Sequence, residues 1–186
     1  TEEIVKSFGN NRITYYKKEN AERAAARNYG AAKAKGDYIT FLDSDDLLYA
    51  HYLEVAKDCI EKNNQPPFLY IAHEIRDDAG KLITVQDTVR TGEVGFLVDG
   101  NPLSCLGVFI RKDVWALFQF NEDRKLSASE DWELWLRIVA NYGITADGRV
   151  SATMVYHENR SVLEIDEEAI AARKQLAIDY AFKDAR

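Results

Sequence analysis

The sequence GDYITFLDSDD, residues 36–46, places a cluster of acids directly after an apolar run. Residues 38–42 carry apolar side chains on both faces, a pattern typical of a buried strand in a largely parallel sheet. Asp43, Asp45 and Asp46 follow at the carboxyl end of that strand. Open α/β sheets bind their ligands in the crevice outside the carboxyl ends of their strands, so the cluster is a candidate site.

Helices and strands are predicted to alternate on both sides of this stretch. An Ala-rich helix is expected at residues 21–35, a second helix at 50–62 and a strand at 68–73. The alternation favours an α/β fold with an open, mostly parallel sheet flanked by helices. Residues 77–101 hold four glycines and few periodic apolar residues, so we expect an irregular segment with one short strand at 82–85. The other predicted elements are a helix that ends near residue 8, strands at 12–17, 106–110 and 150–156, and helices at 112–118, 130–142 and 167–183.

Length, charge and cysteine content restrict the class of protein. The 186 residues are expected to form a single domain with one core. The formal net charge of -7 argues against binding to nucleic acid, which requires clustered Lys and Arg. No apolar run approaches the roughly 20 residues of a membrane span. Cys59 and Cys105 lack metal-ligand spacing, so we expect two buried, unpaired thiols, as in a reducing compartment.

The three carboxylates after residue 42 suit a divalent cation. Like charges this close repel one another unless a cation holds them together. Oxygen ligands favour Mg²⁺ or Mn²⁺, which usually keep water ligands and share the phosphates of a substrate. A diphosphate leaving group requires such a metal, because negative charge develops on it as the bond breaks. The structural alternative is a turn in which an aspartate, Asp46 above all, caps the next helix.

A second group of acids opens the helix predicted at 130–142. Ser127 and Glu130 fit a capping box, with Ser127 as the N-cap and Glu130 reaching back to its amide. The helix macrodipole also favours acids in a first turn. These effects explain Glu130 better than Asp131, a carboxylate that a helix start would hold rigidly and that can take a proton from an alcohol. Trp132 falls at core spacing, which favours burial over a role as a sugar-stacking platform.

Two blocks of sequence resemble family 2 glycosyltransferases of the GT-A fold. ENAERAAARNYGAAKAKGDYITFLDSDD, residues 19–46, matches an Arg-Asn-x-Gly helix followed by a Gly-Asp-Tyr-Ile strand that ends in Leu-Asp-x-Asp-Asp. SEDWELWLR, residues 129–137, is similar to the family's Glu-Asp-Trp-x-Leu-Trp-x-Arg helix. The two blocks in this order are a specific signal, which a lone Asp-x-Asp would not be.

The resemblance implies an enzyme that transfers a sugar from a nucleotide diphosphate, UDP above all, to an acceptor hydroxyl with inversion at the anomeric carbon. It implies that Asp45 ligates the metal, Mg²⁺ or Mn²⁺, and that Asp43 contacts the metal or the donor ribose. Arg27 would lie near the donor base, and Asp131 would be the general base. His157, at the end of a predicted strand, would contact the metal or the diphosphate, although a lone His is more often a surface or capping residue.

The same resemblance divides the chain into functional halves. Residues 1–75 would form the nucleotide-binding half and residues 76–165 the acceptor-side half, followed by a C-terminal helix at 166–186. Glu130 and Trp132 would lie near the base on the acceptor side. In the family a strand and a turn normally precede the matched region, so we expect the first strand or strands to be missing from this chain.

The acceptor implied by the resemblance is a glycan, a lipid-linked sugar or another hydroxyl compound, in a setting such as polysaccharide biosynthesis. We expect a cytoplasmic location, because nucleotide sugars are available in the cytoplasm. A position at the inner face of the membrane is compatible with this expectation. Peripheral membrane contacts and homo-oligomer contacts stay open, and no nucleic-acid partner is expected.

Two other classes of protein stay open at the level of sequence. A nucleotidyltransferase that forms nucleotide sugars shares the α/β architecture and the metal-binding carboxylates, but it normally carries a Gly-rich phosphate loop near its N-terminus. A non-catalytic relative would keep the fold and bind a sugar or a protein partner. The presence of Asp43, Asp45 and Asp131 together argues against this second alternative.

Overall fold

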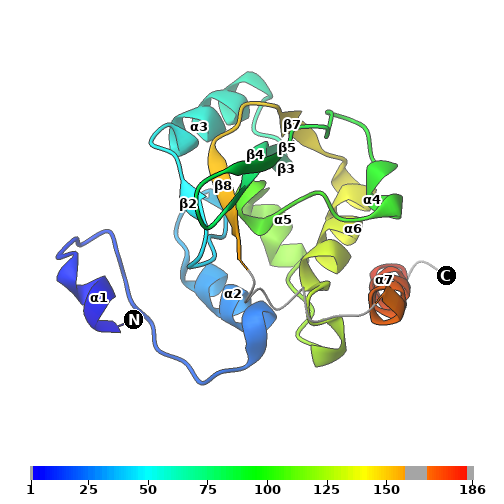
Figure 1. Cartoon of the computed structure of the whole chain (residues 1–186), viewed down its shortest axis with the longest axis horizontal. Helices are drawn as coiled ribbons and strands as arrows, with labels where there is room; N and C mark the ends of the chain where they lie inside the picture. Colours follow the sequence, from blue (N-terminus) through cyan, green and yellow to red (C-terminus); the bar gives the residue numbers. More distant parts are fainter. Residues whose placement is uncertain (1, 158–166, 184–186) are drawn as a thin grey trace.

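The computed structural model describes residues 2–157 and 167–183 (Figure 1). Its helices are α1 (Glu2–Ser7), α2 (Glu22–Lys33), α3 (Tyr52–Lys62), α4 (Phe96–Asp99), α5 (Lys112–Leu117), α6 (Glu130–Tyr142) and α7 (Glu167–Ala181), with the short 3-10 helices η1 (Cys105–Gly107) and η2 (Arg124–Leu126). Its strands are β1 (Tyr38–Ile39), β2 (Leu47–Leu48), β3 (Phe68–Ile71), β4 (His73–Asp77), β5 (Leu82–Gln86), β6 (Val108–Arg111), β7 (Thr145–Asp147) and β8 (Ala152–Tyr156).

The first sheet is built around β3 and has the strand order β1-β6-β3-β7. β3 pairs antiparallel with β6 and parallel with β7, and β6 also pairs antiparallel with β1. Every residue of β3 is buried. The uninterrupted apolar run FLYI follows from this position, because a central strand covered on both faces needs apolar side chains throughout.

The second sheet has the strand order β2-β8-β4-β5 and joins the first sheet at Ala72. β3 ends at Ile71 and β4 begins at His73, so one extended segment runs from the first sheet into the second. Ala72 donates its N–H to the carbonyl of Asp147 (2.9 Å) and accepts the N–H of Ser151 (3.2 Å), which continues the pairing across the junction. β8 pairs antiparallel with β2 and parallel with β4, and therefore runs beside the chain that follows the acidic cluster.

Helix α6 fills the centre of the core. Leu134, Trp135 and Ile138 have no exposed surface, and the Trp135 ring centroid lies 5.4 Å from that of Phe68 on β3. Helix α7 lies beside α6 (Figure 1) and buries Ala177 completely. The observed bounds of α6 confirm the helix predicted at 130–142, because apolar residues at helical spacing face both the sheet and α7.

The α/β fold class is confirmed, together with most of the predicted helices and strands. The described strands form two mixed sheets, because β6 and β5 return antiparallel beside β3 and β4. The strand predicted at 12–17 is wrong, since residues 13–21 form neither helix nor strand. Helix α1 has no buried residue and extends away from the rest of the fold (Figure 1). In the segment after it, Tyr16 contacts helix α2 instead of a strand, with its ring centroid 6.2 Å from that of Tyr29.

The strand predicted at residues 38–42 is shorter than expected. Only Tyr38 and Ile39 pair with a neighbour, β6, and Leu42 is 52% exposed. β1 is an edge strand of its sheet, so in the described part of the chain it pairs with a strand on one side only. The prediction that both faces of this strand are buried is therefore wrong for residues 40–42. These residues form the start of the loop that carries the acidic cluster. The elements without a prediction are β2, β7, α4 and η2, of two to four residues each, together with β4 beyond its first residue, His73.

Both cysteines are buried and carry free thiols, which confirms the expectation from their spacing. Cys59 lies on α3 and Cys105 begins η1. Within residues 2–157 and 167–183, no helix combines the length and the apolar character that crossing a membrane would require.

Candidate active site

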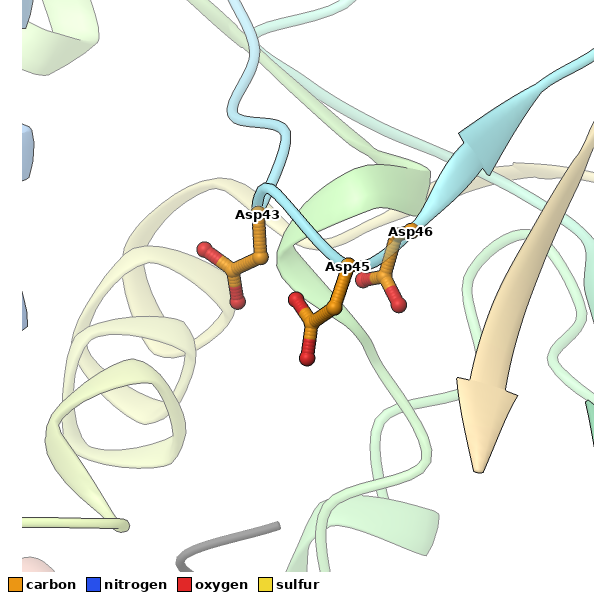
Figure 2. Close-up of side chains that lie close together, drawn as sticks. All are labelled: Asp43, Asp45 and Asp46. Carbon is orange, nitrogen blue, oxygen red and sulfur yellow. The ribbon is translucent and has the colours of Figure 1, made fainter. Parts of the chain in front are cut away.

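The acidic cluster lies on the loop between β1 and β2. A backbone hydrogen bond from the Asp46 N–H to the Asp43 carbonyl (3.2 Å) closes a turn, and the three side chains project from it to the same side (Figure 2). One carboxylate oxygen from each of Asp43, Asp45 and Asp46 lies within 4.8 Å of the other two. Because like charges repel at this distance, the geometry favours a cation between them.

Asp46 is anchored to β8. Its Oδ1 accepts the N–H of Val155 at 3.2 Å, and the residue is 8% exposed. Helix α3 begins only at Tyr52, after His51, and has no side-chain cap. The alternative interpretation, in which Asp46 caps the next helix, is therefore wrong, because the short strand β2 lies between the cluster and α3.

Strand β8 carries His157 to the acidic cluster. It runs antiparallel to β2, which directly follows Asp46, so the end of β8 returns to the start of β2. The Nε2 atom of His157 lies 3.1 Å from Oδ2 of Asp45, and both side chains are partly exposed. The structure thus brings together the residues predicted as metal ligands, Asp43, Asp45 and His157, whose role stays a prediction.

The guanidinium of Arg27 links the acidic cluster to the start of α6. Its Nη2 donates to both carboxylate oxygens of Asp43 at 2.9 Å, and its Nη1 donates to Oε1 of Glu130 at 3.1 Å. The side chain is 9% exposed, and its guanidinium carbon lies 5.4 Å from the centre of the Phe120 ring. Arg27 is therefore built into the protein wall of the site, and its contact with a donor base stays a prediction.

Glu130 binds arginines instead of closing a capping box. Its Oε1 lies 3.1 Å from Arg27 Nη1 and 3.1 Å from Arg23 Nε, while its Oε2 has no hydrogen-bond partner in the described part of the chain. Helix α6 starts after Ser129, whose side chain makes no cap, so the prediction of Ser127 as N-cap is wrong. The physical reason is burial. Glu130 is 4% exposed, and a buried carboxylate is stabilised more by a positively charged partner than by a hydrogen bond from a backbone amide.

Asp131 occupies the next position of α6, and both of its carboxylate oxygens are hydrogen-bonded. Oδ1 accepts the N–H of Trp132 at 2.8 Å, and Oδ2 accepts from Nδ2 of Asn101 at 3.0 Å. Burial and the neighbouring charge of Glu130 raise the pKa of Asp131 to about 6. A carboxyl group with this pKa is ionised at neutral pH and is a stronger base than an ordinary aspartate.

Trp132 and Glu130 lie next to Asp131, as the sequence predicted, but both are buried. Trp132 is 3% exposed, and its indole N–H donates to the carbonyl of Leu97 at 3.0 Å. The simpler interpretation of Trp132 as a core residue therefore agrees with the structure. Little of either side chain is exposed, and their place on the acceptor side stays a prediction.

Two further residues, Asn28 and Asn101, complete the site and were not predicted as site residues. Asn28 donates to the carbonyl of Phe120 (2.9 Å) and accepts the N–H of the same residue (3.0 Å), which fixes the ring beside Arg27. The Arg-Asn pair in the sequence was the signal for Asn28. Asn101 lies in the segment predicted to be irregular, where no periodic pattern distinguishes one polar residue from another.

A pocket of about 400 Å³ opens between α2 and residues 39–44. Its volume falls within the range of roughly 300–1,000 Å³ that small-molecule sites occupy. Arg27 and Asp43 are part of its lining, so the pocket reaches the acidic cluster. The α2 side of the pocket combines two arginines, Arg23 and Arg27, with the small residues Ala26, Gly30 and Ala31.

The side chains at the cluster fit a divalent cation such as Mg²⁺ or Mn²⁺. Hard cations of this kind prefer carboxylate oxygens, and Mn²⁺ also accepts imidazole nitrogen. Asp43 and Asp45 would supply the oxygens, and His157 lies within hydrogen-bonding distance of Asp45. The partial exposure of these side chains leaves room for ligands from a substrate.

Comparison with known sequences identifies the family. Residues 1–86 match the sequence profile described as Glycosyl transferase family 2. The UDP-Glc:alpha-D-GlcNAc-diphosphoundecaprenol beta-1,3-glucosyltransferase WfgD of Escherichia coli is 33% identical over 146 residues, which cover 76% of this chain and 54% of WfgD. An uncharacterized glycosyltransferase of Rickettsia bellii is 31% identical over 130 residues, which cover 68% of this chain and 18% of that protein. The chain belongs to glycosyltransferase family 2.

Comparison with solved structures agrees on the fold. TarS of S. aureus in complex with UDP-GlcNAc superposes with a TM-score of 0.68 at 17% sequence identity, covering 96% of this chain and 54% of the TarS chain. At this identity the likeness concerns the fold, which is that of GT-A glycosyltransferases. The chain spans 54% of WfgD and 18% of the Rickettsia bellii relative, so it corresponds to about half of the former and a small part of the latter.

Proposed function

We propose that the chain forms the site of an inverting glycosyltransferase that moves a sugar from a UDP-linked donor to an acceptor hydroxyl. The observation that carries the proposal is the contact made by one guanidinium. Arg27 joins Asp43 of the acidic cluster to Glu130, which directly precedes Asp131. The candidate cation site and the residue next to the proposed base are thus joined by one guanidinium, and a direct displacement benefits from such fixed positioning of its two ends.

The donor end of the proposed site is the acidic cluster with the adjoining pocket. Asp43, Asp45 and His157 would hold Mg²⁺ or Mn²⁺, which when bound neutralises the charge that develops on a diphosphate leaving group. The pocket between α2 and residues 39–44 would receive the nucleoside. The names of WfgD, which cites UDP-Glc, and of the TarS complex, which cites UDP-GlcNAc, support UDP as the nucleotide.

The acceptor end of the proposed site is Asp131. Its carboxylate would take the proton of the acceptor hydroxyl while the hydroxyl oxygen attacks the anomeric carbon on the face opposite the diphosphate, which inverts the configuration. A pKa of about 6 keeps this base ionised at neutral pH. The division into a donor half at residues 1–75 and an acceptor half at 76–165 is part of the same proposal. A lipid-linked sugar is the acceptor that the name of WfgD supports, and a glycan is the alternative.

The proposal is tested with Asp131→Asn in the complete natural protein. The release of UDP from UDP-glucose and UDP-GlcNAc is measured with Mn²⁺ and a set of lipid-linked and free glycan acceptors. We expect at least a hundredfold loss of kcat with donor binding retained, because the amide cannot accept the proton. The matched control is Asp78→Asn, the same change at an exposed position in the turn after β4, which should leave the rate unchanged. Full activity of Asp131→Asn would exclude the assigned base.

A further inference from the structure

The side chain of Asn101 is held at both ends of its amide group. The N–H of Leu103 donates to Oδ1 of Asn101 at 3.1 Å, and Nδ2 of Asn101 donates to Oδ2 of Asp131 at 3.0 Å. An amide oxygen accepts and an amide nitrogen donates, so the Leu103 contact determines which end of Asn101 faces the carboxylate. The end that faces Asp131 is the donor.

The segment on either side of Asn101 is fixed to helix α6. The indole N–H of Trp132 donates to the carbonyl of Leu97 at 3.0 Å, and that of Trp135 donates to the carbonyl of Leu103 at 3.3 Å; both hydrogen bonds are buried. Asp131, Trp132 and Trp135 therefore hold residues 97–103 at three points. A side chain presented from a segment anchored in this way is preorganised and does not need to be ordered during the reaction.

We propose that Asn101 is a positioning residue for the base of the transfer reaction, an inference that rests on the proposed role of Asp131. The Trp132 N–H holds Oδ1 of Asp131 from within α6, and Asn101 holds Oδ2 from the opposite segment. Two donors on different elements stop the carboxylate from rotating. Each oxygen keeps a second lone pair, so the fixed carboxylate can still accept a proton from an acceptor hydroxyl.

The charges around Asp131 explain why a neutral donor serves here. Glu130 faces it from the same helix, Arg23 and Arg27 face it from α2, and the thiol of Cys105 faces it from η1. Burial and Glu130 disfavour the ionised form, whereas the two arginines favour it. Asn101 stabilises the ionised form of Asp131 by one hydrogen bond. A positively charged donor in its place would lower the pKa of Asp131 more, and so make it a weaker base.

The decisive comparison is between Asn101→Ala and Asn101→Asp in the complete protein. The Asp variant keeps an oxygen for the Leu103 N–H and has the same shape, but it places a second carboxylate against Asp131. If Asn101 only anchored its segment, the Asp variant would behave like the wild type and the Ala variant would be the weaker one. A positioning role requires the opposite order. We expect kcat for UDP release from UDP-GlcNAc to fall about tenfold in Asn101→Ala and further in Asn101→Asp, with KM for the donor changed less than about twofold.

A second measurement does not depend on turnover. Carbon NMR of aspartate carboxyls follows the titration of Asp131 directly, with Asp131→Asn to assign the signal. Loss of the Asn101 donor disfavours the ionised form, so the Asp131 pKa should rise in both variants. An unshifted pKa, or a kcat of Asn101→Asp within twofold of the wild type, overturns the inference. Full activity of Asp131→Asn overturns the assigned base instead, so the two failures are distinguishable.

Discussion

Arg27 shows at the scale of single residues how the site is assembled. Its planar guanidinium donates to Asp43 with one nitrogen and to Glu130 with another, while its central carbon lies over the ring of Phe120, 5.4 Å from the ring centre. A Lys could match only part of this geometry, because an ammonium is a point charge without a planar fork. Replacing Arg27 would leave the buried carboxylate of Glu130 with Arg23 as its remaining arginine partner, which lowers stability because a buried charge needs its partners.

The proposed role of Asp131 as the base implies a pH dependence of the transfer reaction with a defined sign. The pKa of Asp131 is raised to about 6, and a general base acts in its ionised form. Above pH 6 the rate should therefore be nearly constant, and below it kcat/KM should fall about tenfold for each unit of pH. The profile is measured as UDP release at fixed Mn²⁺. An acid limb that begins only near pH 4, as for an ordinary aspartate, would contradict the environment described for Asp131.

At the scale of elements, the sequence predicts best where a pattern is long. Helix α6 was predicted with its observed bounds, because apolar residues at helical spacing continue over thirteen residues. Two strand predictions were wrong: the existence of a strand at 12–17 and the length of the strand at 38–42. A short apolar run forms a strand only where a partner strand lies beside it, and the sequence of the run itself does not say whether one does. The capping box at Ser127 failed for a related reason: Glu130 is drawn to the arginines of α2, a tertiary partner.

Gly107, the last residue of η1 directly before β6, is the position where the chain approaches β3 too closely for a side chain. A Cβ there would lie 2.7 Å from the carbonyl oxygen of Ile71 and 2.8 Å from the Tyr70 ring, both on β3. Backbone on one side and a buried ring on the other leave little room for adjustment. We expect Gly107→Ala to lower the free energy of unfolding by about 2 kcal/mol in urea titrations, since overpacking costs roughly 1–3 kcal/mol.

The matched control for this substitution is Gly148→Ala. A Cβ at Gly148 meets no atom within 4 Å, so this variant should stay within about 0.5 kcal/mol of the wild type. Equal stability of the two variants would show that β6 and β3 are not packed as closely as described.

At the scale of the whole molecule, the candidate site is built from segments far apart in the sequence. Arg27 comes from α2, Asp45 from the loop after β1, Asp131 from α6 and His157 from the end of β8. The motifs in the sequence selected these residues one by one, and the pairing of β8 with β2 explains why His157 meets Asp45. Asn101 was not predicted, because its role depends on a carboxylate thirty residues away and on a segment without periodicity.

The most direct test of the proposed donor site is calorimetric titration of the complete protein with UDP and UDP-GlcNAc, with and without Mn²⁺, beside Asp45→Asn. If the acidic cluster holds the metal that binds the diphosphate, binding should depend on Mn²⁺ in the wild type. In Asp45→Asn it should weaken by at least tenfold, because one charged metal ligand is lost. The control Asp78→Asn should bind like the wild type. Equal binding of UDP by the wild type and Asp45→Asn at every Mn²⁺ concentration would contradict the assignment of the cluster as the donor site.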